Sequence, residues 1–133
     1  MERRVSRVSF FAWILIVVAV GLGEVHAADK LAPFVLGSEA AGDRQKILEE
    51  TTAALKGQGF TIAGRYSPYQ GTDILVVTND FLRKLASEEE SGLYLAGARV
   101  SVTQVGEKTQ VAYNNLEYLQ NAYRVKKSLT PII

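Results

Sequence analysis

The chain has 133 residues and a formal net charge of +1 at neutral pH, from 15 Lys and Arg against 14 Asp and Glu. A balanced chain lacks the excess of basic residues that dominates affinity for nucleic acid, so nucleic acid is not an expected partner. Because the sequence contains no cysteine, no disulfide can stabilise the fold, and packing has to do so.

The first 27 residues are predicted to be a secretory signal peptide. Three arginines precede an uncharged run at 10–23, and small residues follow it. This order of basic, apolar and small-residue regions is typical of signal peptides. Cleavage is expected between Ala27 and Ala28, which would give a periplasmic or secreted chain. The alternative is an uncleaved inner-membrane anchor, although the run is shorter than the roughly 20 residues of a spanning helix.

Cleavage would change the chemistry that the remaining domain, residues 28–133, can perform. It removes three of the basic and two of the acidic residues, which leaves 12 of each, together with the only histidine, tryptophan and methionine. A chain without His and Cys has no imidazole-dependent nucleophile and no usual ligands for copper, structural zinc or haem. We therefore expect no catalytic residue, metal or cofactor, and interpret the acidic run 88–90 as a solvated helix end.

The first half of the domain is predicted to alternate strands and helices. The expected elements are a strand at 33–39, a helix at 43–56, strands at 60–66 and 74–78, and a helix at 80–91. Asp43 and Asn79 are suited to cap the two helices, and the glycines at 57–59 favour a helix end. The apolar run at 74–78 is typical of a central strand, and residues 67–73 indicate a turn.

Residues 99–105 and 108–114 are predicted to form a β-hairpin around Gly106-Glu107. In that register, each residue of the first strand lies opposite the residue of the second strand whose number brings the sum of the two to 213. Val100 and Val102 then share an apolar face with the residues opposite them, while Arg99 opposes Asn114 on a polar face. We expect this polar face to be open, since a small sheet is commonly covered on one side only.

The motif NNLEYLQNAYR at 114–124 predicts a helix. Its N-cap is Asn115, or Asn114 in a capping box with Glu117. At 100° per residue, one arc is apolar and is expected to face the core: Leu116, Tyr118, Leu119, Ala122 and Tyr123. The opposite arc is polar: Glu117, Gln120, Asn121 and Arg124. Packing explains this composition, and the alternative is a site for a small polar or acidic ligand formed by Arg99, Asn114, Tyr118, Asn121 and Arg124.

The C-terminal residues KKSLTPII predict a further helix that is truncated. Ser128 has the character of an N-cap, and Pro131 would lie in the first helical turn, but the chain stops at Ile133.

Four segments carry a resemblance to a known family: GFTIAGRYSPY, ILVVTND, the hairpin GARVSVTQVGEKTQVAYNN, and NLEYLQNAYR. From Leu55 to Arg124 the chain resembles the bacterial domain-of-unknown-function 302 family (DUF302), and the family-like region spans 43–124. In that family the last motif reads Asn-Pro-Glu-Tyr followed by Asn-Ala-Tyr-Arg, and Leu116 replaces its proline here. The resemblance implies an α+β fold in which a small antiparallel sheet curls around a helix, in the order β-α-β-β-α-β-β-α. It also implies pairing as a homodimer, a further C-terminal helix in other members, and no established activity.

These features predict an exported, non-enzymatic protein that binds a ligand or another protein. One alternative is an accessory subunit that docks another exported protein through the open sheet face or the exposed helix stripe. A hydrolase-type enzyme with carboxylate, tyrosine or lysine chemistry is less favoured, because no Ser-x-x-Lys or Gly-x-Ser-x-Gly pattern occurs. A ligand-binding protein should have a pocket with convergent polar groups, whereas a docking subunit should expose an apolar patch.

Overall fold

The α+β class and the predicted order of elements are confirmed in the computed structural model, which describes residues 30–129. Its elements are β1 (Phe34–Ala41), α1 (Arg44–Gly57), β2 (Thr61–Tyr66), β3 (Thr72–Thr78), α2 (Asp80–Glu88), a 3-10 helix (Glu90–Leu95), β4 (Ala98–Val105), β5 (Lys108–Asn114) and α3 (Leu116–Ala122). The helix expected at 80–91 is thus divided into α2 and the 3-10 helix. The expected signal peptide and most of the expected C-terminal helix lie outside the described residues.

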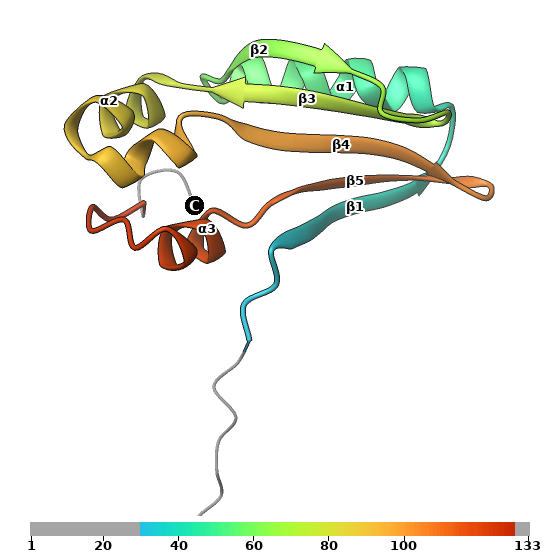
Figure 1. Cartoon of the computed structure of the whole chain (residues 1–133). Coiled ribbons are helices and arrows are strands. Elements are labelled where there is room, and N and C mark those ends of the chain that lie inside the picture. Colours follow the sequence, from blue (N-terminus) through green and yellow to red (C-terminus); the bar gives the residue numbers. More distant parts are fainter. Residues whose placement is uncertain (1–29, 130–133) are drawn as a thin grey trace, which may run out of the picture. The chain divides into compact units, whose positions relative to one another are not determined.

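The five strands form one antiparallel sheet in the order β1-β5-β4-β3-β2 (Figure 1). The hairpin register is confirmed, because Val100 pairs with Tyr113 and Val102 with Val111. The first strand of the sequence therefore lies at one edge, beside the last. At the other edge lies β2, which pairs only with β3.

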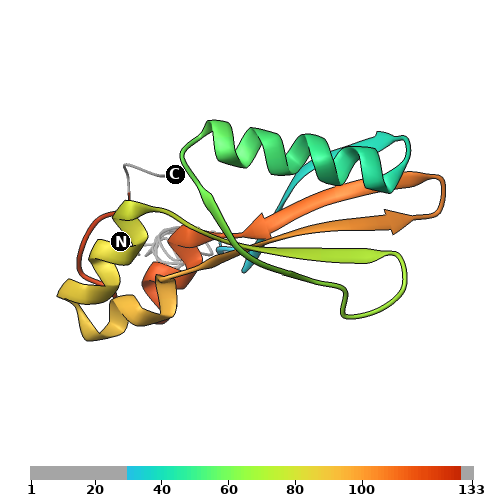
Figure 2. The same ribbon diagram turned by 90° about the horizontal axis from the view of Figure 1, so that it is seen from above.

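Helix α1 lies on one face of the sheet, while α2, the 3-10 helix and α3 gather at one end of the strands (Figure 2). Beneath α1, Leu48 packs against buried side chains of β3 and β4: Leu75, Val77, Ala98, Val100 and Val102. Leu48 is the only buried residue of α1. A second cluster packs the helices at the end of the strands: Leu85, Leu95, Val125 and Leu129. Within residues 30–129, no helix is long and apolar enough to cross a membrane.

The helix ends follow local chemistry. The side chains of Asp43, Asn79 and Asn115 each accept backbone N–H groups at the start of α1, α2 and α3, so the three N-caps are confirmed, and of the two candidates for α3 it is Asn115 that caps. Helices α1 and α3 both end with a left-handed residue, Gly59 (φ 83°) and Arg124 (φ 55°). In each case the backbone N–H groups of that residue and the next return to carbonyls of the last turn, as in a Schellman motif.

Candidate functional site

Arg99 and Asn114 lie together as the hairpin register predicted, but their contact is a structural one. Asn114 is buried, and its Oδ1 accepts the backbone N–H of Arg99 at 2.8 Å. This bond fastens the end of β5 to the start of β4. The side chain of Arg99 is exposed and forms no ion pair with any described residue.

The other three residues of the predicted site are distributed along α3 and its end. Tyr118 is half-buried, and the exposed Asn121 donates its side-chain amide to the carbonyl of Glu117 at 2.9 Å. Arg124 is exposed and occupies the left-handed position that ends the helix. None of the five predicted residues lines either of the two grooves described below.

The expectation that Tyr123 and Ala122 face the core is wrong, since both are exposed. Tyr123 stacks instead on Tyr94 of the 3-10 helix. The reason is that α3 ends here: the chain turns back after Tyr123, and the backbone N–H of Val125 bonds to the carbonyl of Gln120. The left-handed residue that follows turns the chain and buries Val125 in place of Tyr123.

The face of the sheet opposite α1 carries a line of residues that crosses all five strands. Pairing in the sheet aligns Leu36, Ala112, Ser101, Ile74 and Tyr66, one residue from each strand, which we call the cross-strand row. Its ends are exposed apolar side chains, Leu36 at 56% and Tyr66 at 47%. In Figure 1, α1 lies behind the sheet, and no described element covers the strands in front.

A neighbouring line on the same open face also contains apolar residues. Pairing places Phe34 beside Asn114, and Arg99 beside Val76. Phe34 is exposed and Val76 is half-buried. The open face is therefore partly apolar, although β4 and β5 alone suggested a polar one. The apolar groups come from β1, β2 and β3, whose positions in the sheet could not be derived from the hairpin register.

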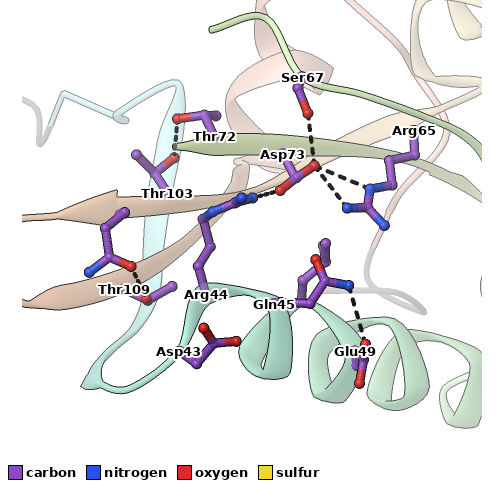
Figure 3. A network of polar contacts seen from close by, with 12 residues as sticks. Asp43, Arg44, Gln45, Glu49, Arg65, Ser67, Thr72, Asp73, Thr103 and Thr109 are labelled. Carbon is purple, nitrogen blue, oxygen red and sulfur yellow. Dashed lines mark hydrogen bonds and ion pairs between the residues drawn. The ribbon is translucent and has the colours of Figure 1, made fainter. Parts of the chain in front are cut away.

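On the α1 side, a buried carboxylate joins three other residues (Figure 3). The side chain of Asp73 is 3% exposed, and its Oδ1 accepts hydrogen bonds from Ser67 Oγ at 2.9 Å and from Arg65 Nη2 and Nε at 3.0 and 3.2 Å. Its Oδ2 is ion-paired with Nη1 of Arg44. The cluster therefore ties the first turn of α1 and the edge strand β2 to β3. Asp73 was expected in a turn, so this cluster was not predicted from the sequence; the residue instead lies in β3.

Two grooves flank α1. The larger, about 430 Å³, lies between α1 and β2 and is lined by Gln45, Leu48, Glu49, Thr52, Ala53, Lys56 and Arg65. The smaller, about 280 Å³, lies between α1 and the strands β1 and β5. Within the described residues, no group of three His, Cys, Asp or Glu side chains is placed to hold a metal ion.

Fold and surface together define a small α+β domain with a half-covered antiparallel sheet. The fold is DUF302-like, as the resemblance implied: the chain is similar to the crystal structure of an uncharacterized conserved DUF302 protein from Bacillus stearothermophilus, with a TM-score of 0.63. That match has 15% sequence identity and covers 71% of this chain and 82% of the other. No family model and no curated protein matches the chain. This likeness establishes the fold of the chain and gives no information about its function.

Proposed function

We propose that the chain is an exported, non-enzymatic interaction domain that pairs with a second copy of itself through the open face of its sheet. The observation that carries this proposal is the cross-strand row, which is apolar at both ends and lies on a face that no described element covers. Exposed apolar side chains that share one uncovered face of a sheet indicate an interaction site.

The composition of β3 supports the same proposal. The run Ile74–Val77 is apolar at every position, and a strand of that kind is commonly covered on both faces. Leu75 and Val77 are buried beneath α1, whereas Ile74 and Val76 are only half-buried on the open face. A second layer over that face would complete the burial that the sequence of β3 favours.

A second copy suits this surface because the row is self-complementary. Ser101 on the central strand β4 lies in its middle, and a large apolar side chain lies at each end. A two-fold axis that runs parallel to the strands, between the Ser101 residues of the two copies, would place Leu36 of one copy over Tyr66 of the other. Closed two-fold pairing through one shared patch is the commonest form of oligomer.

Sedimentation velocity of the purified chain at micromolar concentrations tests the pairing. We expect a dimer, and we expect Leu36→Asp to convert it to a monomer that keeps its circular dichroism spectrum, because this side chain is mostly exposed within one copy. Leu93→Asp is the matched control: Leu93 is exposed to a similar degree but lies on the 3-10 helix, so this variant should remain dimeric. A monomeric parent chain, or dimers of both variants, would refute the proposed interface and leave docking to another exported protein as the alternative.

Export is the other part of the proposal, and it rests on the basic, apolar and small-residue regions before Ala28. Chain recovered from the periplasm of an expressing bacterium should begin at or beside Ala28 on N-terminal sequencing. Recovery in the membrane fraction with Met1 or Glu2 still present would show an anchor instead.

A further inference from the structure

The groove between α1 and β2 presents two cationic side chains. Its helical wall consists of Gln45, Leu48, Glu49, Thr52, Ala53 and Lys56, which recur on one side of α1, and its other wall is Arg65 of β2. A groove of about 430 Å³ lies within the range of small-ligand sites. Lys56 forms no ion pair with any described residue, and so its ammonium group is available to a ligand.

The guanidinium of Arg65 is held in place from one side only. Its Nε and Nη2 both donate to the buried Oδ1 of Asp73, which fixes the plane of the group. Its Nη1 donates to no described residue, and the side chain is 47% exposed. An arginine whose fork is fixed in advance loses less conformational entropy when it binds an anion.

The charge around the groove is not balanced. Asp73 is shared between Arg65 and Arg44, and the remaining carboxylate, Glu49, accepts a hydrogen bond from Gln45. Counting the cluster and the groove together, three cations (Arg44, Lys56 and Arg65) face two carboxylates (Asp73 and Glu49). One further negative charge would neutralise the site.

From this geometry we propose that the groove binds an organic carboxylate, with Arg65 and Lys56 as its cationic contacts. The source of the carboxylate is either a free small acid or the C-terminus of an extended peptide. Because β2 is an edge strand, the backbone groups on its outer side pair with no strand of the described part of the chain and can take up a peptide as an added strand. This site lies on the α1 side of the sheet, so it does not depend on the pairing proposed for the open face.

Titration of the ¹⁵N-labelled chain, followed by NMR, tests the proposal with three probes: N-acetyl-tetraalanine with a free carboxylate, the C-terminal amide of the same peptide, and succinate. The free acid should shift the amide signals of β2 and of the groove side of α1, with an affinity about tenfold or more above that of the amide. Tighter binding of the peptide acid than of succinate would identify a peptide C-terminus as the source, and the reverse a free acid. Equal affinity for peptide acid and amide, or no shift with either acid, would overturn the site.

Two lysine variants separate the groove from a general effect of charge. Lys56→Gln should weaken binding of the acid about fivefold or more, because it removes one cationic contact and leaves the Asp73 cluster intact. Lys46→Gln is the matched control on the same helix, since Lys46 does not line the groove and pairs with Glu50. Equal weakening by the two variants would show that only the net charge of α1 matters, and would refute the site. Arg65→Gln should abolish binding, and an unchanged affinity in a folded Arg65→Gln variant would also refute it.

Discussion

Tyr94 and Tyr123 stack at the surface, with ring centroids 4.5 Å apart and ring planes inclined by 10°. Tyr94 belongs to the 3-10 helix and Tyr123 caps the end of α3, so the stack joins the two segments. The two residues are 65% and 40% exposed, and the pair therefore lies outside the hydrophobic core.

Tyr123→Ala should lower the free energy of unfolding by about 0.5–1.5 kcal/mol, which is typical of an aromatic pair. A core aromatic would lose roughly 3–5 kcal/mol, but much of this ring is already in water. Urea denaturation measures the change, and a double-mutant cycle with Tyr94→Ala should show that the two losses are not additive. A loss as large as that of a core residue would contradict the exposed position.

Arg124→Gly should raise the free energy of unfolding by about 1 kcal/mol, because a side chain at φ 55° carries a steric penalty that glycine avoids. The corresponding residue of α1 is already glycine, and Gly59→Ala should lower stability by a similar amount. Urea midpoints that move in opposite directions for the two variants would bear out this reading. Destabilisation by Arg124→Gly would indicate that the arginine side chain makes contacts that outweigh its strained backbone.

Asp73→Asn should lower the free energy of unfolding by roughly 1–3 kcal/mol, since it weakens charge-assisted hydrogen bonds to a buried group. The loss should stay below that of a fully buried pair, because Arg44 and Arg65 are partly exposed and water can solvate their charges. Asp80→Asn is the control, as this carboxylate pairs with Arg83 in solvent. Equal losses for the two variants, measured by chemical denaturation, would argue that the Asp73 cluster contributes no more than a surface ion pair.

The pairing of Glu39 with Lys108 should be visible in the pH dependence of both groups. Hydrogen bonds from Lys108 and Gln110 hold the pKa of Glu39 below its usual 4.5, and Glu39 raises the pKa of Lys108 above its usual 10.5. The carboxylate then stabilises the fold above pH 4.5 and loses this effect as pH falls through its lowered pKa. The lysine stabilises it below pH 10.5 and loses its effect as pH rises through its raised pKa.

An NMR titration of the side-chain carboxyl of Glu39 checks this pairing. Its midpoint should lie below 4.5 in the parent chain and move toward 4.5 in Lys108→Gln. A midpoint that does not respond to this substitution would show that the two side chains do not pair in solution.

Short-range features of the fold could be predicted from the sequence because their causes are local. The turn at Gly106-Glu107 determines the hairpin register, and the side chains of Asp43, Asn79 and Asn115 define where three helices begin. The burial of Asp73 could not be predicted in this way. It depends on Arg44 and Arg65, which belong to two other elements and reach Asp73 only once α1 and β2 have packed.

In the candidate sites, too, only the short-range contacts could be predicted from the sequence. The hairpin register correctly placed Arg99 beside Asn114, but it gave no information about which strands would lie beyond β4 and β5. The apolar character of the open face therefore became visible only with the pairing of β1 and β3. Ala122 and Tyr123 were expected in the core because a helical wheel does not show where the chain turns back, and it is Val125, beyond that turn, that is buried.

The position of β1 at the edge, beside β5, has a consequence for the order of folding. Contacts between them join distant parts of the chain, as does the hydrogen bond from Asn115, just after β5, to the carbonyl of Ala32, just before β1, across 83 positions. Closing so long a loop is entropically unfavourable until the intervening elements have formed. On the proposed export, a chain that crosses the membrane from its N-terminus would therefore hold this strand unpaired, with Phe34 and Leu36 in contact with water or a chaperone, until almost the whole domain has followed.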